Sequence, residues 1–501
     1  MNKKISISLL YLLILAGTAH AALRVTDLRT EQLKNPLGID IRHPRLGWRI
    51  ESDEQNVMQT AYHILVASSP ELLAQGKGDC WDSGKVKTDA SQWITYQGET
   101  LKRNTPYYWK VKVYTHTNET DWSEPASWSM GLLNEADWQG QWIGLDRPAP
   151  GDSETQWSRL AARYLRKEFA LTKEVKRATV HIAGMGLYEL FINGQRIGEQ
   201  VLAPAPTDYR KTILYNTYDV TPQLQKENAI GVILGNGRFY TMRQNYKPYK
   251  IPTFGYPKLR LNLIIEYTDG SRQTIASDIS WKLTTEGPIR SNNEYDGEEY
   301  DARKELGDWN RTGYDDTNWI PAGRVSIPSG TLRAQMMPGM KVTESLKPVS
   351  IRKQGDKHIL DIGQNMAGWL RIRIKGQAGD SIRLRFAERL QADGEIFTKN
   401  LRDAHCTDIY VVSGREPQDT TWAPRFVYHG FRYVEISGYP NAKTEDFTAE
   451  VVDDEMAHTG TFTCSDETLN QVLHNAFWGI RSNYKGMPVD CPQRNERQPW
   501  L

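Results

Sequence analysis

Apolar and polar residues alternate along much of this 501-residue chain, and no other feature constrains its fold as strongly. In the clearest case, every second residue from Leu259 to Tyr267 is apolar or aromatic, and the turn pair Asp269–Gly270 follows. A period of two places successive side chains on opposite faces of a strand, so that one face can be buried. The sequence therefore predicts a mainly β protein with antiparallel strands and short turns.

The first region of this kind spans residues 22–133. Strands are expected around Trp48, Ile64 and Val111, where aromatic and β-branched residues occupy alternate positions. Short strands separated by Pro, Gly and Asn residues predict an immunoglobulin- or fibronectin-like β-sandwich. No residue of this region suggests chemistry, so we expect a spacer or positioning domain.

Residues 134–325 form the second predicted domain, a larger sandwich that we interpret as a jelly roll. Two loops in it, 235–240 and 292–303, combine charged residues with aromatic ones. Ring faces suit sugars, and clustered carboxylates suit sugar hydroxyls or a bound Ca²⁺. A merely solvated acidic loop is the alternative interpretation. The candidate residues for a carbohydrate or calcium site are Asn236, Arg238, Glu298 and Asp301.

The third predicted domain, residues 333–440, again alternates and indicates another sandwich. The run from Phe426 to Ile436 predicts one long strand with Gly430 as a bulge. His429 lies within this run. A lone histidine in an aromatic strand is typical of a packed, hydrogen-bonded core residue, and we expect this rather than a catalytic group.

The fourth region, residues 450–501, begins with a helix. Ser465 is the expected N-cap, and apolar residues recur at helical spacing as far as Ile480. Gly486 and Pro488 are expected to end the helix. One amphipathic helix of this length cannot bury its apolar face alone, so it needs packing partners.

The last stretch of the chain carries two carboxylates, Asp490 and Glu496, with Arg494 between them and Trp500 after them. Pro492 and Pro499 prevent one regular helix here. A surface loop with ordinary ion pairs is one interpretation. The other is a pocket that holds a polar ligand and transfers a proton, since such a mixture of acids and arginines suits both tasks.

The run from Asp490 to Arg497, with Trp500 after it, resembles the signature of bacterial α-L-rhamnosidases of glycoside hydrolase family 78. The segments 400–404 and 428–433 also resemble segments of that family. The resemblance implies that Glu496 is the general acid and that Asp490, Arg494 and Trp500 bind the substrate. The family often has Asp where this chain has Asn495, so residue 495 is not counted as an acid.

The resemblance also implies a fold and a reaction. The fold is three consecutive β-sandwich domains (fibronectin-like, jelly roll, second sandwich), followed by the first helix of an (α/α)₆ barrel. Some relatives bind rhamnose with calcium in the jelly-roll domain, but the reaction requires no cofactor. The substrate is a rhamnose-containing oligosaccharide or polysaccharide, hydrolysed with inversion.

The water-activating glutamate of the family is not among these 501 residues, so we expect the chain by itself to hydrolyse little. A non-catalytic carbohydrate-binding protein made of the β modules is the alternative function. A different (α/α)₆ glycosidase or lyase is a third hypothesis, because the fold alone does not fix the chemistry.

Residues 1–21 predict a secretory signal, with Lys3 and Lys4 before a short apolar stretch and a small-residue cleavage site at Ala19–Ala21. We expect a secreted or periplasmic protein without membrane insertion. The 62 basic and 61 acidic residues nearly balance, which argues against nucleic acid as a partner. The spacings of the four cysteines predict no disulfide framework, and Cys464 with Cys491 is the one pair for which a disulfide stays open.

Overall fold

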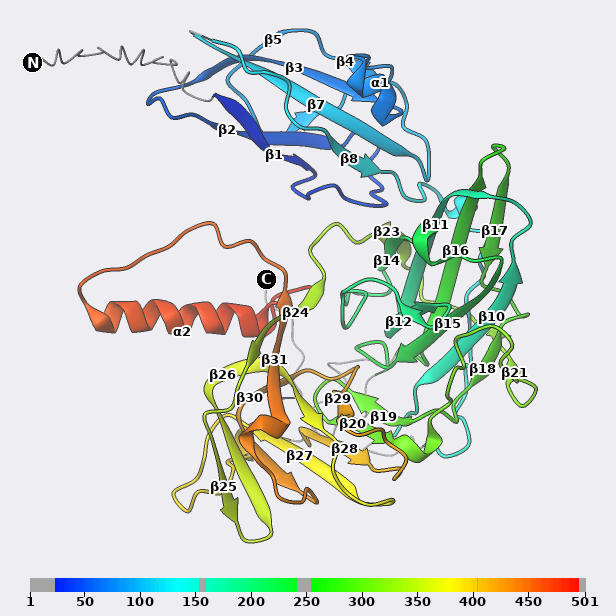
Figure 1. Ribbon diagram of the computed structural model, residues 1–501, viewed down its shortest axis with the longest axis vertical. Helices are drawn as coiled ribbons and strands as arrows, with labels where there is room; N and C mark the ends of the chain where they lie inside the picture. Colours follow the sequence, from blue (N-terminus) through cyan, green and yellow to red (C-terminus); the bar gives the residue numbers. More distant parts are fainter. Residues whose placement is uncertain (1–22, 117, 153–158, 241–253, 403, 495–501) are drawn as a thin grey trace, which may run out of the picture. The chain divides into compact units, whose positions relative to one another are not determined.

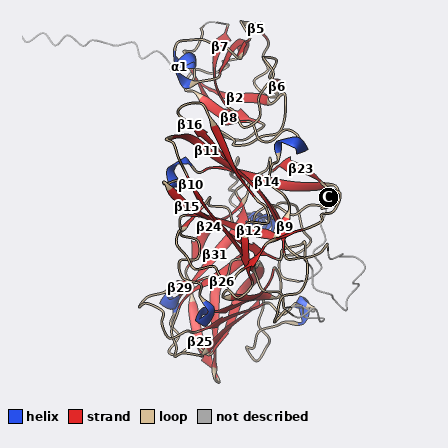
Figure 2. Ribbon diagram, turned by 90° about the vertical axis from the view of Figure 1, so that its right-hand side faces the viewer, coloured by secondary structure: helices blue, strands red, loops and turns tan. Residues whose placement is uncertain are grey.

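The computed structural model describes residues 23–494 except 117, 153–158, 241–253 and 403 (Figure 1). The chain divides into two compact units. The first holds the residues up to 129 except 37–40 and 102–105, and the second holds those two segments and everything from residue 130. Figure 2 shows strands in red throughout both units and few helices, as the alternation in the sequence predicts.

The first unit consists of two antiparallel sheets. One contains β1 (Arg24–Thr30), β2 (Arg45–Glu51) and β6 (Ile94–Thr95). The other contains β3 (Gln59–Ala67), β4 (Trp81–Asp82), β5 (Val86–Lys87), β7 (Pro106–Thr115) and β8 (Ala126–Ser129), with the short helix α1 (Pro70–Ala74) beside them. The indoles of Trp48, Trp109 and Trp128 are buried in this unit. The expected strands around Trp48, Ile64 and Val111 are confirmed.

The second unit begins with two further sheets. The first has six strands: β10 (Arg163–Ala170), β12 (Leu187–Ile192), β13 (Gln195–Arg196), β15 (Glu227–Gly235), β18 (Lys282–Thr284) and β21 (Ile320–Pro321). The second has seven: β9 (Ile143–Gly144), β11 (Val175–Met185), β14 (Thr212–Asp219), β16 (Lys258–Tyr267), β17 (Arg272–Ala276), β22 (Gly323–Arg324) and β23 (Thr331–Ala334).

These two sheets share one apolar core. Val180 and Leu261 from one sheet meet Leu190 and Val232 from the other, and each is at most 1% exposed. Burying such a side chain stabilises the fold by about 1.5–3 kcal/mol. The predicted hairpin at Asp269–Gly270 is confirmed, because β16 pairs with β17 across that turn. The strands β12 and β13 form a second hairpin.

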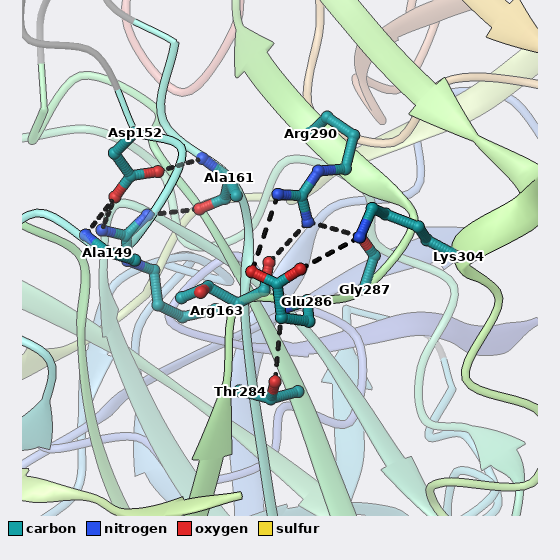
Figure 3. Close-up of polar contacts among 10 residues, drawn as sticks. Ala149, Asp152, Ala161, Arg163, Thr284, Glu286, Gly287, Arg290 and Lys304 are labelled. Atoms are coloured by element: carbon teal, nitrogen blue, oxygen red, sulfur yellow. Dashed lines mark hydrogen bonds and ion pairs between the residues drawn. The ribbon is translucent and has the colours of Figure 1, made fainter. Parts of the chain in front are cut away.

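Two polar clusters lie at the ends of strands in this unit (Figure 3). The Asp152 carboxylate lies 2.8 Å from the guanidinium of Arg163 in β10, and both side chains are almost fully buried. Asp152 also accepts a hydrogen bond from the Ala161 N–H at 3.0 Å. Glu286 pairs with Lys304 at 3.0 Å. This ion pair joins a residue before β19 (Ile289–Asn293) to a residue after β20 (Gly297–Asp301).

A ten-stranded sheet completes the second unit. Its strands are β19 (Ile289–Asn293), β20 (Gly297–Asp301), β24 (Met340–Leu346), β25 (Ser350–Gln354), β26 (Lys357–Arg373), β27 (Ser381–Ala387), β28 (Thr407–Val411), β29 (Thr421–Trp422), β30 (His429–Ser437) and β31 (Phe447–Asp454). The strands β19 and β20 precede residue 325, yet β20 pairs with β28 in parallel. The strand β31 extends the sheet beyond residue 440.

The predicted bulge at Gly430 is wrong. The strand β30 begins at His429, and Gly430 pairs in register with Ala367 of β26. The register shift lies on β26 instead, between Asp361 and Met366, opposite Arg432. The Asp361 carboxylate lies 2.8 Å from Arg432 Nε and also accepts the N–H of Gly363 at 2.7 Å, so this aspartate holds the irregular segment in place.

The helix α2 (Glu467–Asn483) is capped by Asp466, which accepts hydrogen bonds from the N–H groups of Thr468 and Leu469. The predicted N-cap, Ser465, is therefore wrong by one residue. The apolar face of α2 is largely exposed, since Leu469, Val472, Leu473 and Ile480 are 43–58% accessible. No helix among the described residues is both long and apolar enough to cross a membrane.

Candidate functional site

The loop after α2, residues 484–494, carries the described part of the predicted signature. Its Gly486 N–H donates to both carboxylate oxygens of Asp454, at 2.9 and 2.8 Å, at the end of β31. Val489 N–H donates to the Asn483 carbonyl at 2.8 Å and turns the loop back toward the helix. Burial raises the pKa of Asp454 to about 6. These bonds fasten the loop to the ten-stranded sheet.

A buried lysine anchors the same loop. Lys485 is 2% exposed, and its Nζ lies 3.0 Å from Glu294 Oε2. The ammonium also lies over two rings, 4.7 Å from the centroid of Tyr295 and 4.6 Å from that of Tyr428. A buried ammonium needs a partner charge, and aromatic faces add to the attraction. The Tyr428 hydroxyl in turn donates to the Ser482 carbonyl at 2.9 Å, at the end of α2.

The next part of the loop packs against β30 at Gly430. A Cβ atom at residue 430 would lie 2.7 Å from Pro492 Cγ and 3.1 Å from Gln493 Cβ. Non-bonded carbon atoms pack best at about 3.5–4.0 Å, so only glycine admits the loop this closely. Cys406 Sγ donates to the Gln493 carbonyl at 3.1 Å and fixes the same segment.

Asp490 and Arg494 are the predicted substrate-binding residues that the structure describes, and it brings them together. Arg494 Nη2 lies 3.6 Å from Asp490 Oδ2, and Arg494 Nε donates to Cys491 Sγ at 3.1 Å. The Asp490 side chain is 8% exposed, and its Oδ1 is buried with no hydrogen-bond partner among the described residues. A buried acceptor without a donor is costly. This oxygen is therefore suited to accept a hydrogen bond from a ligand hydroxyl.

The other two predicted residues of the signature, Glu496 and Trp500, lie outside the described residues, which end at 494. The considered disulfide is wrong, because Cys464 and Cys491 are both free thiols. Burial raises the pKa of Cys491 to about 11, so this thiol stays protonated beside Asp490.

The residues of the second candidate site have different hydrogen-bond partners. Asn236 is buried, and its Nδ2 donates to the Asn292 carbonyl at 2.7 Å. Arg238 instead lies near the loop after α2, with its Nε 3.7 Å from Glu294 Oε2 and its Nη1 3.7 Å from Met487 Sδ. Asp301 caps a short turn by accepting the Arg303 N–H at 3.1 Å.

Glu298 lies in a buried cluster of the ten-stranded sheet. Its Oε2 accepts the N–H groups of Arg425 and Phe426 at 3.2 and 3.3 Å, and its own N–H donates to Asp408 Oδ1 at 2.9 Å. Burial raises the pKa of Glu298 to about 8, so its carboxyl is neutral at pH 7. His429 Nε2 lies 3.1 Å from the same Asp408 oxygen, and its ring is fully buried. The expectation of a packed core histidine is confirmed.

Glu298 and Asp301 thus accept hydrogen bonds from backbone N–H groups of the protein itself. Within the part of the chain that the structure describes, no group of three or more His, Cys, Asp and Glu side chains is arranged to hold a metal ion.

Lys485 was not singled out from the sequence, although it holds the loop. Its only local signal is a lysine between an aromatic residue and a glycine, just after an amphipathic helix. Its partner Glu294 is distant in sequence, so no spacing rule connects the two.

Comparisons with known proteins match this order of domains. The Rha78A-like N-terminal immunoglobulin domain matches residues 25–134, and the α-L-rhamnosidase N-terminal domain matches residues 173–344. The bacterial α-L-rhamnosidase concanavalin-like domain matches residues 351–453, and its six-hairpin glycosidase domain matches residues 457–501. The chain belongs to the bacterial α-L-rhamnosidase family. This is glycoside hydrolase family 78, and the immunoglobulin-like class of the first domain is confirmed.

Individual relatives agree. An α-L-rhamnosidase of Formosa agariphila is 38% identical over 93% of this chain and 51% of its own length. The solved α-L-rhamnosidase of Dictyoglumus thermophilum has a TM-score of 0.88 and is 39% identical over 95% of this chain and 54% of its own. That of Streptomyces avermitilis, solved with L-rhamnose, has a TM-score of 0.88 and is 28% identical over 96% and 62%. The chain spans about half the length of the first curated relatives.

The close approach of Pro492 to Gly430 allows a test of how the loop 484–494 packs on β30. Gly430→Ala should lower the free energy of unfolding by about 1–3 kcal/mol, because the added methyl group meets the rigid ring of Pro492. Gly479→Ala is the matched control, since a Cβ there has no neighbour within 4 Å. The control should be neutral or slightly stabilising in a helix. Urea denaturation of both variants measures the effects, and equal stabilities would disprove the packing.

The burial of Glu298 can be tested through the pH dependence of the free energy of unfolding. A folded-state pKa of about 8 exceeds the ordinary 4.5, so Glu298 stabilises the fold below about pH 4.5 and this contribution is lost as pH rises toward 8. Glu298→Gln keeps the shape and removes the titration. Relative to this variant, the wild type should therefore lose stability between pH 5 and pH 8 in urea denaturation. Glu299→Gln is the control, and a constant difference between wild type and Glu298→Gln would contradict the burial argument.

Proposed function

We propose that the protein hydrolyses terminal α-L-rhamnosyl residues of plant glycans or glycosides and inverts the anomeric carbon. The observation that carries this proposal is the buried Asp490 carboxylate beside Arg494, on a loop with the signature of the family. Its Oδ1 lacks a hydrogen-bond donor among the described residues and offers a ligand hydroxyl an acceptor. The rhamnose complex of the Streptomyces relative supports the choice of sugar.

In the proposed reaction, Glu496 in its protonated form gives its proton to the glycosidic oxygen as the bond to the anomeric carbon breaks. A second carboxylate takes a proton from the water that attacks the opposite face of the sugar. In inverting enzymes the two carboxyls stand about 6.5–9.5 Å apart, which leaves room for this water. Glu496 must then hold its proton near neutral pH, for which apolar cover from Trp500 is suited.

Asp490 and Arg494 have a different task in this proposal. Asp490 is ionised and accepts hydrogen bonds from rhamnose hydroxyls, and its negative charge favours the protonated form of Glu496. Arg494 orients Asp490, from which its Nη2 lies 3.6 Å away. The second carboxylate is not among these 501 residues, so we propose that the 501-residue chain alone turns over slowly.

The proposal also covers the domain arrangement of the chain and the export of the protein. We propose three consecutive sandwiches, at residues 22–133, 134–325 and 333–440, and assign α2 to the first hairpin of an (α/α)₆ barrel. The apolar face of α2 supports this assignment, since it is exposed among the described residues. Residues 1–21 are proposed to direct export. The reaction uses side-chain acid and base chemistry and needs no cofactor, and calcium binding in the second domain stays a prediction.

The test is Glu496→Gln in the full-length encoded protein. Hydrolysis of an α-L-rhamnosyl disaccharide should fall by about 10²–10⁴-fold, because the sugar leaving group needs a proton. Hydrolysis of p-nitrophenyl α-L-rhamnoside should fall less, because p-nitrophenolate leaves without one. Glu467→Gln, in the first turn of α2, is the control and should keep the wild-type rate.

Three results would count against the proposal. An unchanged rate for Glu496→Gln on the disaccharide would remove Glu496 from the acid role. Sugar binding without any hydrolysis by the full-length protein would favour a non-catalytic carbohydrate-binding protein. Fast turnover by the 501-residue chain alone would mean that the second carboxylate lies within it.

A further inference from the structure

A polar groove of about 770 Å³ lies on the ten-stranded sheet, and no residue of the loop 484–494 lines it. Its floor includes two arginines of β27, Arg383 and Arg385. Side chains alternate across a strand, so both arginines lie on the face opposite Leu384, which is fully buried. In the sheet they lie opposite Ser437 and Glu435 of β30.

The two arginines are available to a ligand. Both are exposed, and neither guanidinium group makes a hydrogen bond or ion pair with any residue that the structure describes. Two residues along a strand span about 6.6–6.8 Å, so the pair can grip one anionic group or two neighbouring ones. Guanidinium groups bind carboxylates and sulfates through two parallel hydrogen bonds, which favours planar or tetrahedral anions over neutral hydroxyls.

The acidic residues of the groove are already engaged. Glu435 pairs with Lys357 at 3.2 Å, and Glu299 pairs with Arg159. Glu298 is buried and holds a proton at pH 7. Asp296 accepts the N–H of His405 at 2.9 Å. Glu299 and Glu435 are thus balanced by cations, whereas Arg383 and Arg385 carry positive charge that no ion pair with a described residue offsets.

The rest of the lining suits a sugar chain. Hydroxyl and amide groups surround the arginines, on Ser291, Asn293, Thr398, Thr407 and Ser437. No Phe, Tyr or Trp is among the lining residues in the described part of the chain, so bases of a single-stranded nucleic acid would have no ring on which to stack.

We propose that this groove binds an acidic glycan, with a carboxylate or sulfate group of the chain held between Arg383 and Arg385. The choice of a glycan rests on the proposed function. The groove is a second binding site beside the hydrolytic one, and it selects acidic rhamnose-bearing chains. It is connected to the signature loop through the segment 405–407, because His405 and Thr407 line the groove while Cys406 donates to the Gln493 carbonyl.

The test is binding measured by calorimetry on the 501-residue chain, with hexagalacturonate as a carboxylate probe and a κ-carrageenan hexasaccharide as a sulfate probe. Cellohexaose is the neutral probe, and a single-stranded DNA oligomer is the nucleic-acid probe. At least one acidic glycan should bind about tenfold or more tightly than cellohexaose and the DNA. Raising the salt from about 0.05 M to about 0.5 M should weaken this binding.

The variant Arg383→Gln/Arg385→Gln should lose about tenfold or more of that affinity. Arg352→Gln/Arg373→Gln removes two arginines of the same sheet that do not line the groove, and it should bind as the wild type does. Circular dichroism and the urea midpoint show that both variants fold. If only hexagalacturonate binds, the group held by the arginines is a carboxylate. If only the κ-carrageenan hexasaccharide binds, it is a sulfate.

The proposal is overturned if the acidic glycans bind no better than cellohexaose, if DNA binds as well as they do, or if the groove variant keeps full affinity. The binding assay contains no rhamnose and no turnover. Its failure would therefore leave the proposed hydrolysis untouched, and failure of the Glu496→Gln test would leave the groove untouched.

Discussion

The ion pair between Lys485 and Glu294, enclosed by the rings of Tyr295 and Tyr428, is the interaction on which the arrangement of the signature loop depends. Both charges are buried, so each is tolerated only because the other is present, and removing one partner of such a pair typically costs about 3–5 kcal/mol. The pair joins the loop after α2 to the turn between β19 and β20. A residue beside the predicted catalytic segment is thereby fixed to the β framework.

Strands from distant parts of the chain bring together the partners of Lys485. The turn that carries Glu294 and Tyr295 belongs to strands that join the ten-stranded sheet beside β28, while Tyr428 directly precedes β30. Gly430 leaves space for Pro492, and Asp454 accepts the N–H of Gly486. The loop therefore rests on β30, on the end of β31 and on the turn between β19 and β20, and it holds Asp490, whose Oδ1 has no hydrogen-bond partner among the described residues. Rigid support of this kind is what the precise positioning of a ligand requires.

The sequence predicted the local features well, because alternation and turn pairs act between neighbours. The strand from Leu259 to Tyr267 and the hairpin at Asp269–Gly270 are examples. Contacts between remote segments could not be predicted. Gly430 seemed a bulge because its neighbour Pro492 is far along the chain, and Glu298 seemed a ligand because nothing local showed that a remote strand would bury it.

Hydrogen exchange followed by mass spectrometry on Lys485→Met tests most directly whether the buried pair holds the loop. The account predicts that amides of residues 486–494 exchange about tenfold or more faster than in the wild type, because local opening becomes easier. Amides of β27 should keep their protection, because the partners of Lys485, which are Glu294, Tyr295 and Tyr428, lie outside that strand. Unchanged exchange in the loop, or an equal increase in every strand of the second unit, would contradict the account.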